Sequence, residues 1–111
     1  MSQYVVVFMT APDEEVAATI GRSLVEEGLC ACCNVVNPIR SIYRWKGEVY
    51  DEKEVLCVLK TRSTLFESLK KRVRELHPYD VPELIALPVE KGLDEYLCWI
   101  DEVTARTERT G

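Results

Sequence analysis

Long apolar runs and an excess of basic residues are both missing from this chain. No apolar run approaches the roughly 20 residues that a membrane-spanning helix needs. The 14 Lys and Arg residues are outnumbered by 19 Asp and Glu residues, which gives a net charge of −5. A nucleic-acid groove requires a basic stripe, so we expect neither a membrane protein nor a nucleic-acid-binding one. The first nine residues lack a basic start and a cleavage site, and we expect them to form a strand and not a signal peptide.

Features of common catalytic sites are also scarce. The chain has one histidine, no glycine-rich phosphate loop and no serine elbow, which excludes an ordinary Ser-His-Asp hydrolase. No activated nucleophile or base stands out, so we expect neither an enzyme nor an organic cofactor, although carboxylate pairs for acid–base chemistry stay open. Five cysteines are an odd number in a chain of 111 residues, which is long enough to fold without disulfides. Reduced thiols and a cytoplasmic location are therefore expected.

Apolar periodicity divides the chain into alternating strands and helices. The expected elements are a strand over 3–9, a helix over 13–27, a strand over 29–36 with a bulge at Asn37-Pro38, a hairpin over 41–61, a helix from Ser63 or Thr64 to His77, a strand over 83–89 and a helix over 93–106. Asp13 and Thr64, the latter in a capping-box spacing with Glu67, are the expected helix caps. Residues from 104 on are expected to fray. The order β-α-β-β-α-β-α predicts an α+β, ferredoxin-like single domain over 1–111 with an extra C-terminal helix.

The stretch 41–61 predicts one long β-hairpin. Lys46-Gly47 supplies the two-residue turn, because glycine accepts the positive φ that a tight turn needs. This register places Tyr43, Trp45 and Tyr50 on one face near the tip, while Val58 lies in an arm base that is apolar on both faces. Several other strands are also apolar on both faces, which is more apolar surface than a monomer normally exposes. We therefore expect a closed oligomer with these four residues as interface candidates.

Three groups of polar or reactive residues are candidates for a functional site. The segment 30–33, C-A-C-C, looks like a metal cluster, but no second cysteine pair stands at a zinc-site spacing, so packing is the favoured interpretation. His77 ends a helix and is either a cap for the last carbonyls or a metal ligand or proton handler. Glu54 lies with Glu52 on one face of the hairpin arm, where acidic residues either prevent aggregation or line a pocket between subunits.

Several motifs are spread over nearly the whole chain: T-A-P-D at 10–13, L-C-A-C-C-N-V at 29–35, S-I-Y-R-W-K-G at 41–47, L-K-T at 59–61, H-P-Y-D-V-P-E at 77–83 and Y-L-C-W-I at 96–100. With these motifs the chain resembles the CutA family of divalent-cation tolerance proteins. The resemblance implies a ferredoxin-like fold and a homotrimer, with the three hairpins packed together and clefts between subunits. It also implies tolerance of copper and other divalent ions.

The resemblance assigns metal ligands residue by residue. His77 of the H-P-Y motif and Glu54, shortly before L-K-T, correspond to ligands proposed for the family. Met9 stands where the family has a third ligand, a cysteine, and a thioether suits Cu(I) but supplies no thiolate. The first function hypothesis is a trimeric divalent-cation tolerance protein that binds copper or another divalent metal ion weakly in clefts between subunits.

The alternative is a regulatory or scaffold trimer of the nitrogen-signalling type that binds a small anionic ligand or a partner protein. In that case Lys60, Arg44, Tyr79 and Trp45 line the cleft as charged, donor and stacking groups. The two hypotheses predict ligands of opposite charge, which makes them separable by experiment.

Overall fold

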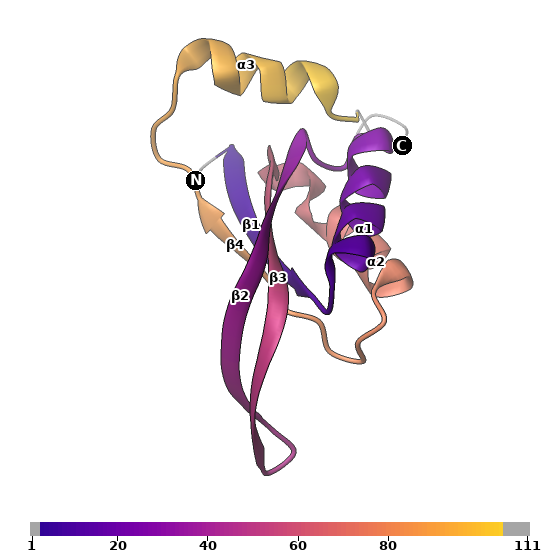
Figure 1. Ribbon diagram of the computed structural model, residues 1–111. Coiled ribbons are helices and arrows are strands. Elements are labelled where there is room, and N and C mark those ends of the chain that lie inside the picture. The colour runs from indigo at the N-terminus through magenta and orange to yellow at the C-terminus, as the bar shows by residue number, and fades with distance from the viewer. Residues whose placement is uncertain (1–2, 106–111) are drawn as a thin grey trace.

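The computed structural model describes residues 3–105 (Figure 1). Its elements are β1 (Tyr4–Ala11), α1 (Glu14–Glu26), β2 (Cys32–Trp45), β3 (Glu48–Arg62), α2 (Phe66–Leu76), β4 (Leu84–Pro88) and α3 (Asp94–Val103), with a short 3-10 turn, Ser63–Leu65, before α2. This is the predicted order β-α-β-β-α-β-α. No helix within residues 3–105 combines the length and the apolar character that crossing a membrane requires.

The strands form one antiparallel sheet in the order β2-β3-β1-β4. In the centre, β1 and β3 pair from Tyr4 opposite Arg62 to Ala11 opposite Val55. The short strand β4 lies on the outer side of β1, and the long strand β2 forms the other edge. The predicted α+β class with an antiparallel sheet is thereby confirmed.

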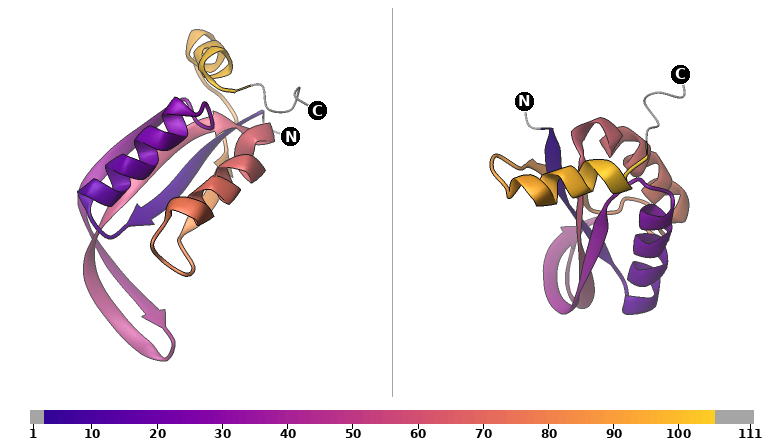
Figure 2. Two further views of the ribbon diagram at one scale, coloured as in Figure 1. Left: turned by 90° about the vertical axis from the view of Figure 1, so that its right-hand side faces the viewer. Right: turned by 90° about the horizontal axis from the view of Figure 1, so that it is seen from above.

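Both α1 and α2 pack on the same face of the sheet, as Figure 2 shows. Along β1 and β3 every second side chain faces these helices, because successive strand residues point to opposite faces. The buried core includes Val7, Met9, Ala11, Val55, Cys57 and Leu59 from the sheet and Ala17, Ile20, Leu24, Leu69 and Val73 from the helices. Burial of each large aliphatic side chain stabilises the fold by roughly 1.5–3 kcal/mol.

Local signals set the two ends of α1. The Asp13 side chain accepts a hydrogen bond from the Val16 amide over 2.8 Å and is the predicted N-cap. Gly28, just past the C-terminal end, has a φ of 73°, in the left-handed region that glycine adopts without strain. A Cβ at Gly28 would also lie 2.8 Å from the Ala105 nitrogen, so both conformation and space require glycine there.

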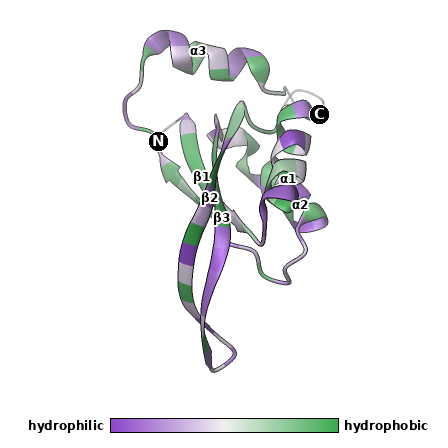
Figure 3. Cartoon of the chain, in the orientation of Figure 1, coloured by the Kyte–Doolittle hydropathy of each residue, from purple (hydrophilic) through white to green (hydrophobic). Residues whose placement is uncertain are grey.

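β2 and β3 extend past the rest of the sheet as a protruding hairpin (Figure 1). Tyr43 pairs with Tyr50 and Trp45 with Glu48, which is the predicted register. Lys46 and Gly47 close the turn with φ values of 50° and 83°, as a twisted two-residue hairpin turn requires. The register shifts between Val36 and Ile39, where the Asn37-Pro38 peptide is cis, and this confirms the predicted bulge. Figure 3 shows hydrophobic bands along β2, part of which protrudes beyond the helices of residues 3–105.

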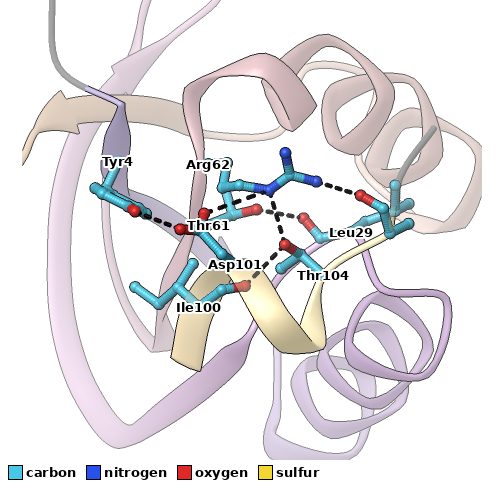
Figure 4. A network of polar contacts seen from close by, with 8 residues as sticks. Tyr4, Leu29, Thr61, Arg62, Ile100, Asp101 and Thr104 are labelled. Carbon is cyan, nitrogen blue, oxygen red and sulfur yellow. Dashed lines mark hydrogen bonds and ion pairs between the residues drawn. The ribbon is translucent and has the colours of Figure 1, made fainter. Parts of the chain in front are cut away.

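α3 lies at the opposite end of the molecule from the hairpin tip (Figure 1) and is tied to the sheet by polar contacts (Figure 4). The Tyr4 hydroxyl donates to Asp101 Oδ2 over 2.6 Å. Arg62 Nε donates to Thr104 Oγ1 over 2.9 Å, and the Thr104 hydroxyl lies 2.8 Å from the Ile100 carbonyl oxygen. These contacts hold the last helix although it buries little apolar surface.

The first and last described residues both reach the end of β3. The Ser63 amide donates to the Gln3 carbonyl oxygen over 2.8 Å, and Arg62 donates to the Ala105 carbonyl oxygen. The two described ends of the chain therefore lie at the same end of the fold.

The structure corrects two of the predicted element starts. β2 begins at Cys32 and not at residue 29, because the Leu29 amide bonds back to the Leu24 carbonyl oxygen at the end of α1. Cys30 therefore precedes the strand. α2 has Leu65 as its N-cap without a side-chain bond, so the capping box built on Thr64 is wrong; the 3-10 turn that precedes the helix takes its place.

The predictions for the last helix also need correction. α3 ends at Val103, and Ile100 is its one buried residue, whereas Tyr96 and Val103 are exposed. Thr104 is buried and bonded and does not fray. The rest of the predicted frayed tail, residues 106–111, lies outside the described residues.

Candidate functional site

A groove of about 710 Å³ opens between the hairpin arm and the loop that joins α2 to β4. The hairpin curves toward the side on which this loop lies (Figure 2, left). The lining residues are Thr10, Arg40, Ser41, Ile42, Tyr43, Trp45, Glu54, Tyr79, Asp80, Val81, Pro82 and Glu83. Three structural regions that are distant in sequence thus build one concave surface, which is the usual form of a ligand site.

Glu54 lies at the buried end of this groove. It is only 7% exposed, and its Oε2 accepts a hydrogen bond from the Tyr79 hydroxyl over 2.9 Å. Within residues 3–105 its other oxygen, Oε1, has no hydrogen-bond partner and no cation forms an ion pair with the carboxylate. No fully buried side-chain oxygen or nitrogen within residues 3–105 lacks a hydrogen-bond partner, so Oε1 is open to the groove, where a cation can approach it.

His77 organises the loop next to Glu54. The Tyr79 amide donates to Nδ1 over 3.1 Å, so the ring proton lies on Nε2, which donates to the Thr10 carbonyl oxygen over 2.7 Å. The His77 and Tyr79 ring centroids are 4.8 Å apart. His77 is therefore a neutral, buried histidine with both ring nitrogens engaged, and its contacts place the Tyr79 hydroxyl on Glu54.

Tyr79 connects His77 with Glu54. Burial and the hydrogen bond to Glu54 raise the pKa of the Tyr79 phenol, because both disfavour the phenolate. The hydroxyl therefore stays protonated at neutral pH and acts as a donor to the carboxylate.

The remaining charges in the groove are mostly negative. Asp80 and Glu83 line it from the loop, and within residues 3–105 the one cationic lining residue is Arg40. Arg40 donates through Nε and a terminal nitrogen to both carboxylate oxygens of Asp51 at 2.8 and 2.7 Å, which lowers the pKa of Asp51. Because its charge is engaged by Asp51, the groove as a whole favours a cation.

Aromatic rings form the hairpin wall. Tyr43 donates its hydroxyl to Glu52 over 2.7 Å, which raises its pKa to about 12, and its ring stacks on Tyr50 with centroids 5.3 Å apart. Trp45 lies nearer the tip, and the Lys46 ammonium sits 5.6 Å from its ring centroid. This wall presents flat apolar faces beside the carboxylates.

Not all of the predicted site residues come together. Glu54, Tyr79 and Trp45 line the groove. His77 is outside the lining residues but contacts Tyr79. Arg44 and Lys60 are outside the lining residues. Lys60 Nζ donates instead to Asn34 Oδ1, farther along β3.

Two of the other predicted residues belong to the sheet. Met9 is fully buried on the helix-covered face, opposite Cys57, whereas Glu54 points to the other face next to Val55. Val58 is half-buried on the face away from α1 and α2, opposite Phe8. Sequence reasoning missed Asp80 and Glu83, although both follow His77 within the same short motif.

No group of three or more His, Cys, Asp or Glu side chains is arranged to hold a metal ion among residues 3–105. The cysteines of segment 30–33 serve packing. Burial raises the pKa of the Cys30 thiol to about 12, and a hydrogen bond between Cys33 and Cys57 together with burial raises the pKa of Cys33. Cys32 Sγ lies 3.7 Å from the Tyr96 hydroxyl of α3.

The fold and the groove together define a small α+β protein with a cation-favouring groove beside a protruding hairpin. The family model described as "CutA1 divalent ion tolerance protein" matches residues 5–103. The chain belongs to this CutA1 divalent ion tolerance family.

Individual relatives support this membership. The chain is 54% identical over 99 residues to the divalent-cation tolerance protein CutA of Thermus thermophilus, covering 89% of this chain and 96% of that protein. It is 47% identical to the CutA protein of Mus musculus over 94% of this chain but spans 59% of that longer protein. Among solved structures, CutA1 from Oryza sativa superposes with a TM-score of 0.91 at 39% identity, covering 95% of this chain and 96% of that chain.

Proposed function

We propose that this protein is a divalent-cation tolerance protein that binds copper or other divalent metal ions in its groove and works as a homotrimer of ferredoxin-like protomers. The observation that carries the proposal is Glu54: a nearly buried carboxylate that has one neutral partner and faces a groove rich in further carboxylates. Such an arrangement attracts a cation and supplies an oxygen ligand to it.

Glu54 is the first ligand in this proposal and His77 the second. His77 coordinates a metal only after one ring nitrogen gives up its present hydrogen bond to Tyr79 or Thr10, which lowers the net gain from metal binding. Two ligands per chain make a weak site, so we expect micromolar or looser affinity unless water or a neighbouring subunit completes the coordination.

Exposed apolar residues support the trimer. On the sheet face away from α1 and α2, Ile85 is 52% and Leu87 44% exposed, and on the hairpin Ile42 is 64% and Val49 62% exposed. Ile85 and Leu87 share one face of β4, and Ile42 and Val49 share one face of the hairpin, so each pair forms an exposed apolar patch that another chain can cover. In the proposed trimer the hairpins and open faces of neighbouring copies cover it, with contacts from Tyr43, Trp45, Tyr50 and Val58. The clefts then form where the groove of one copy meets the next copy.

Copper titration of three variants tests the metal site. We expect Glu54→Gln to weaken copper binding about tenfold or more, since it replaces a charged oxygen ligand by a neutral amide. His77→Ala is expected to weaken it by a smaller factor. Glu102→Gln, which removes an exposed charge on α3, serves as the control and leaves affinity unchanged. Copper affinity that is equal in the parent and in Glu54→Gln removes Glu54 from the site and overturns the proposal.

The assembly is tested separately by the mass of the particle in dilute solution. A trimer is expected, and Trp45→Ala is expected to loosen it, because interface aromatics often carry a large share of the binding energy. A stable particle of 12.7 kDa, the mass of one chain, contradicts the trimer.

The proposal gives the protein a binding role in the cytoplasm and no catalysed reaction. All five cysteines are free thiols, which is compatible with a reducing compartment. No observation favours the alternative of an anionic ligand, because Lys60 and Arg44 are not among the residues that line the groove with Tyr79.

A further inference from the structure

The same groove is suited to an organic cation as well as to a metal ion. We propose that it binds a linear aliphatic polyamine, with one ammonium group on Glu54, a second on the carboxylates of the α2–β4 loop, and the methylene stem along the aromatic wall. This inference rests on the proposed function only in using the same cation-favouring groove. It names a different ligand class, and the experiment below separates the two.

The size of the groove favours an organic ligand. Its volume of about 710 Å³ falls within the roughly 300–1,000 Å³ of pockets that hold small organic molecules. A metal ion bound at Glu54 occupies only a small part of this space and does not reach along the hairpin wall formed by Tyr43 and Trp45.

The geometry at Glu54 favours an ammonium over a guanidinium group. Oε2 already accepts the Tyr79 hydroxyl over 2.9 Å, while Oε1 is open. An ammonium group is a compact charge that needs one acceptor at a time, whereas a guanidinium group binds best when both carboxylate oxygens are available side by side. Glu54 as a residue is 7% exposed, and its one open oxygen therefore fits a primary amine.

The loop provides the second anchor. Asp80 and Glu83 follow Tyr79 and line the same groove. A second ammonium group along the stem reaches these carboxylates, whereas a monoamine leaves them without a partner. The groove thus distinguishes polyamines from simple amines by the number of charges that it satisfies.

The aromatic wall is suited to the methylene stem of the ligand. An ammonium group within about 6 Å of an aromatic centroid is attracted to the ring face, but the Lys46 ammonium, 5.6 Å from the Trp45 centroid, already makes this contact. The ammonium groups of the ligand therefore bind the carboxylates, and its stem packs on the rings. Tyr43 is held in place by its bond to Glu52 and its stacking on Tyr50. The Tyr43 ring is therefore in position before a ligand arrives, which reduces the entropy lost on binding.

Calorimetric titration of the assembled protein with spermidine, at about 0.15 M salt to screen long-range attraction, tests the proposal. Butylamine and Mg²⁺ are the matched ligands, the first with one charge and the second with two charges but no stem. We expect spermidine to bind about tenfold or more tightly than either, and Glu54→Gln to weaken spermidine about tenfold or more. Glu102→Gln leaves spermidine affinity at the parent value.

Equal losses in Glu54→Gln and Glu102→Gln, or no loss in Glu54→Gln, show non-specific attraction to an acidic protein and overturn the proposal. Absence of spermidine binding to the parent also overturns it; if copper binding still depends on Glu54, the metal proposal stands. Spermidine binding without copper binding has the opposite meaning: the polyamine proposal stands and the metal proposal fails.

A fluorescence measurement covers the case in which Glu54→Gln does not fold. The chain has two tryptophans, and Trp99→Phe on α3 leaves Trp45 as the sole reporter. Emission that changes and saturates with spermidine but not with butylamine supports the proposal, and emission that is unaffected by spermidine contradicts it.

Discussion

His77 Nε2 donates to the carbonyl oxygen of Thr10 over 2.7 Å and joins the end of α2 to the end of β1. We expect His77→Ala to lower the free energy of unfolding by about 1–3 kcal/mol, because it leaves the buried Thr10 carbonyl and the Tyr79 amide without these partners. Urea denaturation measures the loss. His77→Gln keeps an amide donor and is expected to lose less; if His77→Ala is as stable as the parent, the histidine has no structural role.

Tyr79→Phe isolates the donor to the buried carboxylate. Removing it is expected to cost about 1.5–3 kcal/mol, the range for a hydrogen bond to a charged group. In a double-mutant cycle with Glu54→Gln, the two changes are expected to be non-additive because they remove the same contact. Tyr50→Phe is the control, since the Tyr50 hydroxyl forms no hydrogen bond within residues 3–105. Strictly additive effects exclude the coupling.

The hydrogen bond between Tyr4 and Asp101 makes us expect the stability of the fold to depend on pH in the alkaline range. The hydrogen bond to Asp101 and burial raise the pKa of Tyr4 to about 12 in the folded protein, above about 10 for a free tyrosine. The raised pKa means that the protonated phenol is favoured by folding. Its contribution to stability is complete below about pH 10 and is lost as pH rises toward 12.

Phenolate absorbance of the parent and of Asp101→Asn checks this expectation. One tyrosine is expected to titrate at lower pH in the variant, because its hydrogen bond to a charged acceptor is gone. Titration curves that superimpose rule out the assignment to Tyr4.

Val58 tests the open face of the sheet. Its side chain lies opposite Phe8 on the face that α1 and α2 leave uncovered, so Val58→Asp is expected to leave an unpaired charge in the proposed interface and to prevent association. Light scattering is expected to give the mass of a single chain. Val25→Asp places the same charge on the partly exposed side of α1 and is expected to leave the assembly intact. A trimer that persists in Val58→Asp excludes this face from the interface.

The cysteines are expected to differ widely in reactivity. Cys98 is exposed, whereas Cys57 and Cys30 are buried and burial raises the pKa of Cys30 to about 12. The thiolate is the reactive form, and although the hydrogen bond from Cys33 lowers the pKa of Cys57, the Cys57 side chain is fully buried and out of reach of the reagent. Iodoacetamide at neutral pH is therefore expected to modify Cys98 first and Cys30 and Cys57 only after unfolding. Mass spectrometry over time measures the order, and Cys98→Ser is expected to remove the fast phase. Early modification of Cys30 contradicts the packing interpretation.

The elements that depend on local chemistry could be predicted from the sequence. Lys46-Gly47 determines the turn, and the period of two then places Tyr43 opposite Tyr50. Asp13 and Gly28 mark the ends of α1 for equally local reasons. The prediction that Thr64 caps α2 was wrong because a 3-10 turn forms there in place of a capping box. The two arrangements start the helix only one residue apart.

The site could be predicted only in part, because it depends on contacts distant in sequence. The partner of His77 is a backbone carbonyl 67 residues away, and a carbonyl has no sequence signature. Lys60 shares a strand face with Glu54, so the period of two alone allows both in one site. The six residues of strand between them, however, separate the two side chains by roughly 20 Å. Asp80 and Glu83 enter the groove because of the path of the α2–β4 loop, which only the folded chain reveals.

The meeting of both described ends at Arg62 and Ser63 has a practical consequence for protein engineering. Since Gln3 and Ala105 bond to adjacent residues of β3 and the turn after it, a short flexible linker can join them in a circularly permuted gene. New termini opened at the exposed Lys91-Gly92 connection leave the hairpin and the groove continuous. In such a permutant α3 becomes the first element of the chain instead of the last. Its contribution to folding can then be measured separately.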